Sequence, residues 1–169
     1  SAVRLTSANS INVARWLPQM FYYFIAYRAL KQKNKKLVFS VPSGNFGNIC
    51  AGLMGQQMGL PINHFIACTN LNDSVPRYLK TGNYEPLPTK QTISNAMDVG
   101  NPSNFIRIQT IFNNDIVKMK KTFSGYSYTD NETKKALKEI FISCMRFCIY
   151  PFVSFLYFQR PFIKSRKMY

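Results

Sequence analysis

The chain has 169 residues, enough for one hydrophobic core, and carries a formal net charge of +15. Such a charge alone would favour nucleic acid or an anionic membrane as a partner, but the basic residues are scattered in singles, pairs and small clusters rather than forming one stripe. We therefore expect no nucleic acid and no membrane as partners. His64 is the only histidine and the four cysteines lack Cys-x-x-Cys spacing, so we expect no metal site, no disulfide framework, and reduced thiols in the cytoplasm.

The first expected element is a helix from Ile11 to Leu30. Its apolar residues lie on nearly every face, which predicts a largely buried helix. Asn9 or Ser10 is placed to cap its start, and Pro18 either opens its regular part or kinks it.

The Leu37–Cys50 stretch predicts a buried strand, a small-residue loop and the start of a helix. Gly44 and Gly47 would let the backbone approach a ligand closely. A loop of this kind brings unpaired backbone N–H groups and a helix N-terminus to one point, which favours binding of a phosphate group. The spacing leaves the owner of that phosphate open, and a turn whose glycines serve only tight packing is the alternative.

The helix after this loop should end at Gly59, and His64–Thr69 predicts the next buried strand. Strand, helix and strand form a βαβ unit, in which ligands bind outside the carboxyl ends of the strands. We therefore expect Ser43–Asn48 and Thr69–Asp73 to share one edge of the sheet. His64 begins its strand at the opposite edge, which predicts a structural role.

The rest of the chain alternates polar loops with helices. Asn72 or Asp73 should cap the first helix, with Pro76 in its first turn. Loops are expected over residues 81–92 and 94–103. The expected helices cover Asn70–Lys80, Asn104–Phe112 and the surface segment Asn131–Phe141.

The composition changes at about Phe141. Residues 142–169 contain no acidic residue and are crowded with aromatics. A C-terminal membrane anchor is one interpretation, but Arg146 and Pro151 interrupt the apolar run below the ~20 residues that a spanning helix needs. We favour a shifted reading frame, which predicts a domain over 1–141 followed by a divergent tail over 142–169 without an evolved fold.

The Ser43–Asn48 loop, Ser-Gly-Asn-Phe-Gly-Asn, resembles the phosphate-binding loop of threonine synthases. Further segments resemble the same family in order and spacing, and together they cover the chain from about Leu5 to Ile140. They are Asn9–Arg15, Thr69–Arg77 and Ser94–Asn104.

The resemblance implies an α/β fold, the three-layer α/β/α architecture of fold type II enzymes (the tryptophan synthase β-like class), here incomplete. It implies pyridoxal 5'-phosphate as cofactor and a carbon-oxygen lyase that converts O-phospho-L-homoserine and water to L-threonine and phosphate. By resemblance, the cofactor phosphate is held by Ser43, Gly44, Asn45, Phe46, Gly47 and Asn48.

Candidates for the substrate end lie mainly where a helix N-terminus carries an arginine one turn in, because such a site can bind the leaving phosphate. A helix cap with a surface arginine is the alternative. The candidates are Asn9, Ser10, Asn12 and Arg15, with Arg77 and Asn95 as looser ones.

The lysine that forms a Schiff base with the cofactor lies, in that family, ahead of the Asn9–Arg15 segment. The resemblance therefore implies that this lysine is outside the chain and that the chain is inactive alone. The alternatives are another fold type II enzyme using pyridoxal phosphate, or a basic module that binds nucleic acid or membrane without catalysis.

Overall fold

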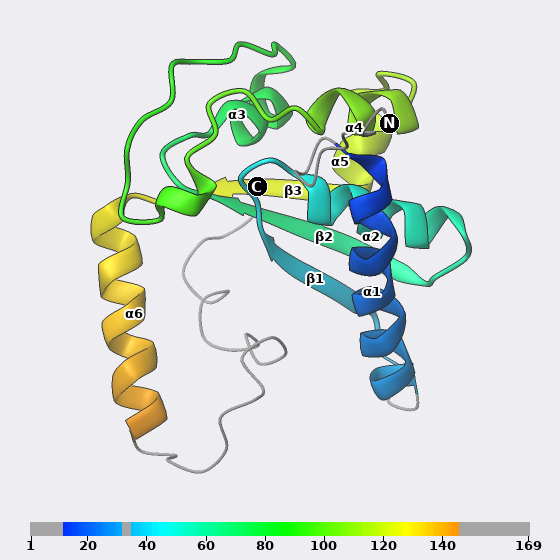
Figure 1. Cartoon of the computed structure of the whole chain (residues 1–169), viewed down its shortest axis with the longest axis horizontal. Coiled ribbons are helices and arrows are strands. Elements are labelled where there is room, and N and C mark those ends of the chain that lie inside the picture. Colours follow the sequence, from blue (N-terminus) through cyan, green and yellow to red (C-terminus); the bar gives the residue numbers. More distant parts are fainter. Residues whose placement is uncertain (1–11, 32–34, 146–169) are drawn as a thin grey trace, which may run out of the picture. The chain divides into compact units, whose positions relative to one another are not determined.

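The computed structural model describes residues 12–31 and 35–145 (Figure 1). The chain divides into two compact units, residues 1–133 and 134–169, and the second holds most of helix α6. The described elements of the first unit, in chain order, are η1 (Val13–Arg15), α1 (Trp16–Leu30), β1 (Leu37–Pro42), α2 (Gly47–Gln57), β2 (Ile62–Thr69), α3 (Ser74–Thr81), η3 (Asn95–Met97), α4 (Phe105–Ile111), α5 (Ile116–Thr122) and β3 (Phe123–Ser127). Helix α6 spans Asp130–Met145.

The three strands form one parallel sheet in the order β1-β2-β3. Phe39 of β1 pairs with Phe65 of β2, which pairs with Phe123 of β3. Because all three strands run the same way, their carboxyl ends meet at one edge, called the carboxyl edge below. The predicted α/β class, the βαβ unit and the shared edge are thus confirmed, whereas β3 itself was not predicted.

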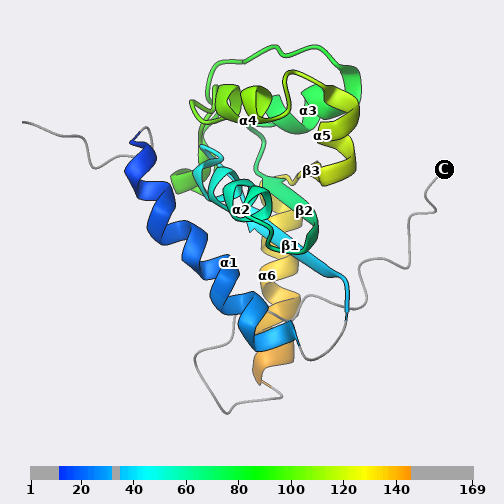
Figure 2. The same cartoon turned by 90° about the vertical axis from the view of Figure 1, so that its right-hand side faces the viewer.

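Helices pack on the face of the sheet that carries Phe65. A Cβ on Gly52 of α2 would lie 2.5 Å from Phe65 Cε1 and 2.8 Å from Tyr23 Cζ of α1, so glycine at this position lets the two helices and the sheet approach closely. On the same face, a Cβ on Gly125 would lie 2.9 Å from Pro76 Cα of α3. In Figures 1 and 2, α1 and α2 run side by side, while α3, α4 and α5 lie together on the β3 side of the sheet.

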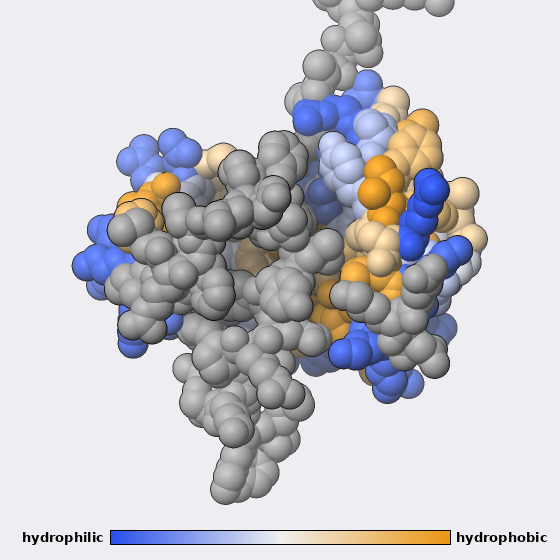
Figure 3. All heavy atoms as spheres, turned by 90° about the horizontal axis from the view of Figure 1, so that it is seen from below, coloured by the Kyte–Doolittle hydropathy of each residue, from blue (hydrophilic) through white to orange (hydrophobic). Residues whose placement is uncertain are grey.

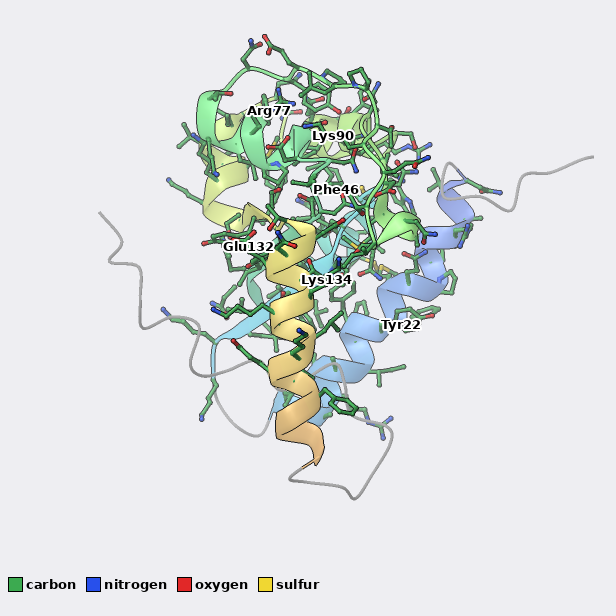
Figure 4. The ribbon with its side chains drawn as sticks, turned by 90° about the vertical axis from the view of Figure 1, so that its left-hand side faces the viewer. Tyr22, Phe46, Arg77, Lys90, Glu132 and Lys134 are labelled. Carbon is green, nitrogen blue, oxygen red and sulfur yellow. The ribbon has the colours of Figure 1, made fainter. Side chains whose placement is uncertain are left out.

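Helix α1 corrects the expectation of a largely buried element. It begins at Trp16, with Pro18 in its first turn, and buries only Trp16, Met20 and Tyr23. Phe21 is 56% exposed and Ile25 66% exposed. Tyr22 points away from the body of the first unit (Figure 4), and hydrophobic and hydrophilic residues lie side by side on the described surface in Figure 3.

Strand β1 is less buried than its apolar sequence predicts. Only Val41 is buried, and Val38 is 43% exposed. The reason is topological, since β1 is an edge strand of the described sheet and the face opposite Phe65 is only partly covered.

The remaining predicted elements agree with the structure within a few residues. Helix α2 ends just before Gly59, whose φ of 98° suits glycine. The imidazole Nε2 of His64 is hydrogen-bonded to the Ser124 hydroxyl at 3.0 Å, which agrees with a structural role for this histidine. Helix α5, which the sequence analysis missed, is capped by Asp115, whose side chain accepts from the Val117 N–H at 2.9 Å.

Residues from 146 onward lie outside the described part, so both interpretations of the tail stay untested. Helix α6 runs to Met145, past the predicted boundary at Phe141. Among residues 12–31 and 35–145, no helix is long and apolar enough to cross a membrane.

Candidate phosphate-binding site

The loop between β1 and α2 places a helix N-terminus at the carboxyl edge. Helix α2 begins directly after Phe46, which adopts a left-handed conformation with φ 59°. Among the described residues no side chain caps this end, and the first helical bond runs from the Cys50 N–H to the Phe46 carbonyl at 3.0 Å. The N–H groups of Gly47, Asn48 and Ile49 therefore have no acceptor within the helix.

This arrangement fits a phosphate group. Gly47 and Ile49 are buried, and buried N–H donors are stabilised when they meet an acceptor. Helix α2 has 11 residues, so its dipole adds positive potential at the same point. Donors and dipole together favour an anion at the mouth of the loop.

Ser43 stabilises the loop through hydrogen bonds within the protein. Its N–H donates to the carbonyl of Cys68 on β2 at 2.8 Å, and its hydroxyl donates to the Val41 carbonyl at 2.9 Å. Both of its donors are thus used within the protein, and Ser43 is buried. Its predicted contact with the cofactor phosphate stays a prediction.

A segment from a different part of the chain lies directly on this loop, and we call residues 92–104 the strap. A Cβ on Gly44 would lie only 2.9 Å from Met97 Cα of the strap. Asn45 Oδ1 accepts from the Ser103 N–H at 2.6 Å and from the Ser103 hydroxyl at 3.0 Å. The Phe46 ring packs edge-on against Phe105 with centroids 6.2 Å apart, just beyond the strap. Three consecutive loop residues are therefore held from outside the βαβ unit.

The other end of the strap is fixed where β2 ends. Asn70 Nδ2 donates to Asp98 Oδ1 at 2.6 Å and to Thr92 Oγ1 at 2.9 Å. The Thr92 N–H and hydroxyl also donate to the Asp98 carboxylate, at 3.0 and 2.7 Å. Asn72 adds a bond from its Nδ2 to Asn70 Oδ1 at 2.9 Å. The strap thus bridges the carboxyl ends of β1 and β2.

The Asp98 carboxylate is electrostatically suited to this role. Partial desolvation would raise its pKa, but hydrogen bonds from the Thr92 hydroxyl and N–H and from the Asn70 amide outweigh that effect and hold the pKa below its ordinary value of 3.8. Asp98 is therefore ionised at neutral pH and accepts these bonds as a carboxylate.

Tyr23 and Cys50 fix the first turn of α2 through hydrogen bonds. The Tyr23 hydroxyl donates to the Asn48 carbonyl at 3.1 Å and contacts Asn48 Oδ1. Burial raises the pKa of the Cys50 thiol to about 12, an effect that Arg107 partly offsets, and burial likewise raises the pKa of Tyr23. Both groups are neutral at physiological pH and act as structural donors.

The substrate-end candidates of the N-terminal segment are only partly described. Asn9 and Ser10 lie outside the described residues. Asn12 caps η1, its Oδ1 accepting from the Ala14 N–H at 3.0 Å. Arg15 ends the same turn and is exposed. Their predicted role in binding substrate stays a prediction.

The two looser candidates occupy different places. Arg77 lies on α3, with Nε 3.6 Å from Asp73 Oδ1 and Nη2 donating to the Glu85 carbonyl at 2.7 Å (Figure 4). Asn95 is exposed in η3 within the strap, where its carbonyl accepts from the Asp98 N–H at 3.0 Å. Only Asn95 therefore shares an element with the segment that touches the phosphate loop.

A buried group at the C-terminal end of the strap was not among the predicted site residues. Asn104 is fully buried, its Oδ1 accepts from Arg107 Nη1 at 2.6 Å, and its carbonyl lies 3.4 Å from the donating Cys50 Sγ. The Arg107 guanidinium stacks over the Trp16 ring, 5.0 Å from its centroid. The only sequence feature that could have indicated this pair is the spacing of three residues between Asn104 and Arg107, which places both side chains on one face of a helix.

Other kinds of site are not supported in the described part. Across residues 12–31 and 35–145, no three His, Cys, Asp or Glu side chains gather as metal ligands would. Two hollows of that part lie at the amino ends of the strands, one beside Leu37 and the other beside Thr122, away from the phosphate loop.

Comparison with known proteins gives one consistent result. No family model matches the chain. Threonine synthase of Buchnera aphidicola subsp. Schizaphis graminum is 50% identical over 141 residues, which are 83% of this chain and 33% of that protein. The crystal structure of threonine synthase from Escherichia coli matches with a TM-score of 0.72 and 40% identity, over 87% of this chain and 37% of that one. A threonine synthase from Brucella melitensis with bound PLP matches with a TM-score of 0.71 and 35% identity, over 76% of this chain and 33% of that one. The chain spans about a third of the length of the relatives it matches.

Proposed function

We propose that this chain, a homologue of threonine synthases over about a third of their length, forms the cofactor-phosphate site of a threonine synthase-like lyase. The enzyme would convert O-phospho-L-homoserine and water to L-threonine and phosphate, the final step of threonine biosynthesis. The observation that carries the proposal is the uncapped N-terminus of α2, whose buried N–H groups face the carboxyl edge of a parallel sheet. We assign that position to the phosphate of pyridoxal 5'-phosphate.

In this proposal the chain supplies binding and orientation. Pyridoxal phosphate, when bound, supplies an electron-accepting pyridine ring. The N–H groups of Gly47, Asn48 and Ile49 would bind its phosphate, and Gly44 and Asn45, held by the strap, would fix the loop around it. Fixed donors of this kind stabilise an anion without reorganising when it arrives.

The substrate phosphate needs a second site, which we assign to the N-terminal segment. Arg15 lies one turn beyond Asn12. A guanidinium and helix-terminal donors can hold a leaving phosphate through charge-assisted bonds. Asn9 and Ser10 would join this site, with Arg77 and Asn95 as outer candidates.

We further propose that the Schiff-base lysine is supplied by another segment, that the chain alone is inactive, and that it works in the cytoplasm on a small-molecule substrate without nucleic acid. The described thiols Cys50 and Cys68 are free, which fits a reducing compartment. Another fold type II enzyme would use the same phosphate loop, so the reaction itself has to be tested.

The test is a chimera in which residues 1–141 replace the matching part of E. coli threonine synthase. We expect the chimera to bind pyridoxal phosphate and to release phosphate from O-phospho-L-homoserine. An Asn45→Asp variant should lose both, because a carboxylate repels the cofactor phosphate, while Asn113→Asp, an exposed change elsewhere, should lose neither.

Two outcomes would contradict the proposal in different ways. A folded chimera that binds pyridoxal phosphate but releases no phosphate would favour another fold type II reaction. A folded chimera that takes up no cofactor would refute the phosphate assignment itself.

A further inference from the structure

The side chain of Asn45 is oriented by a residue far away in the sequence. Its Oδ1 accepts two hydrogen bonds from Ser103, one from the N–H at 2.6 Å and one from the hydroxyl at 3.0 Å. A backbone N–H can only donate, so the atom that it meets must be the amide oxygen. Both lone pairs of that oxygen are used by Ser103, so the Asn45 side chain is held against the strap.

Ser103 is itself held in place by buried neighbours. The adjacent Asn104 is fully buried and accepts from Arg107 Nη1 at 2.6 Å. The Arg107 guanidinium lies 5.0 Å from the centroid of the Trp16 ring on α1. Phe105, the first residue of α4, is fully buried. The strap therefore meets the phosphate loop from a rigid base, not from a free loop.

We propose that Ser103 is a positioning residue of the phosphate site, which fixes Asn45 and with it the phosphate loop in the conformation that receives the anion. The inference rests on the proposed function, because it concerns the same phosphate. Ser103 does not touch the phosphate in this scheme; it acts through Asn45. The consequence is that the phosphate loop is preorganised by the strap as well as by its own glycines.

The experiment uses the full 169-residue chain and inorganic phosphate as the probe, with backbone amide NMR of residues 44–49 as the readout. Ser103→Ala removes one of the two bonds to Asn45, and we expect phosphate binding to weaken about 5-fold and amide exchange of the loop to accelerate about as much. Ser103→Thr keeps the hydroxyl, so we expect this variant to have the phosphate affinity and the slow loop exchange of the wild-type chain. The matched control Thr110→Ala removes a hydroxyl that bonds only within α4, to the Ile106 carbonyl at 2.9 Å, and should change neither.

Asn45→Asp separates orientation from ligand binding. Its carboxylate still accepts both Ser103 donors, so loop exchange should stay slow, but its negative charge repels phosphate, so binding should be lost. Unchanged exchange and unchanged binding in Ser103→Ala would overturn the inference. If the wild-type chain binds no phosphate while Ser103→Ala still accelerates exchange of the loop, the tether is upheld and the proposed function fails.

Discussion

Substituting Gly44 tests the contact between the phosphate loop and the strap. The added Cβ of Gly44→Ala would lie 2.9 Å from Met97 Cα and 3.3 Å from its carbonyl oxygen, whereas carbon atoms normally approach to about 3.5–4.0 Å. Both clashing atoms are backbone, and Met97 directly precedes Asp98, whose bonds hold the strap together with those of Ser103. The strap must shift as a unit, so we expect a loss of roughly 1–3 kcal/mol in the free energy of unfolding.

Urea unfolding followed by circular dichroism measures that loss, and titration with inorganic phosphate measures its effect on the site. Gly55→Ala is the matched control, because its Cβ would meet its nearest neighbour, Met20 Cγ, at an ordinary 3.5 Å. Within a helix that change should stabilise the chain by roughly 0.5–1 kcal/mol. If Gly44→Ala keeps wild-type stability and phosphate affinity, the strap does not press on the loop and the reasoning is refuted.

Three further outcomes are expected. Gly52→Ala should destabilise the chain by roughly 1–3 kcal/mol in the same urea assay, since its Cβ would lie 2.5 Å from an aromatic carbon of β2; stability equal to Gly55→Ala would contradict the helix packing. The folded pKa of Asp98 is depressed, so its contribution to stability is present above pH 3.8 and is lost as pH falls through the lower folded value; Asp98→Asn should remove this acid-dependent component, and an identical pH profile of unfolding would argue against the network. In peptide mapping after iodoacetamide treatment at neutral pH, Cys50, which is fully buried with a pKa of about 12, should be modified more slowly than the partly exposed Cys68, and the reverse order would be inconsistent with the core.

The phosphate loop was predictable because its signals are local. Gly44 and Gly47 follow an apolar run and precede a segment with helical spacing. The strand, the turn and the helix N-terminus could therefore all be recognised within fourteen residues, Leu37–Cys50. The structure adds the left-handed Phe46, a backbone state that a non-glycine residue rarely takes and that the sequence did not indicate.

The contact between the strap and the phosphate loop could not be predicted from the sequence. Asn45 and Ser103 are 58 positions apart, and their bond depends on how two loops meet at the carboxyl edge. Strand β3 was hidden by its composition, since Ser-Gly-Tyr-Ser lacks the apolar run of a buried strand. The burial of α1 was overestimated because composition shows that a helix is apolar, but not which of its faces the rest of the chain covers.

The most direct test of the account is a titration of the full chain with pyridoxal phosphate and, separately, with pyridoxal, which lacks the phosphate. Backbone amide shifts report which residues each compound reaches. The account predicts that pyridoxal phosphate shifts the amides of Gly44, Gly47, Asn48 and Ile49 at concentrations where pyridoxal does not. Equal responses to both compounds, or shifts confined to other parts of the chain, would contradict the assignment of this loop as the cofactor-phosphate site.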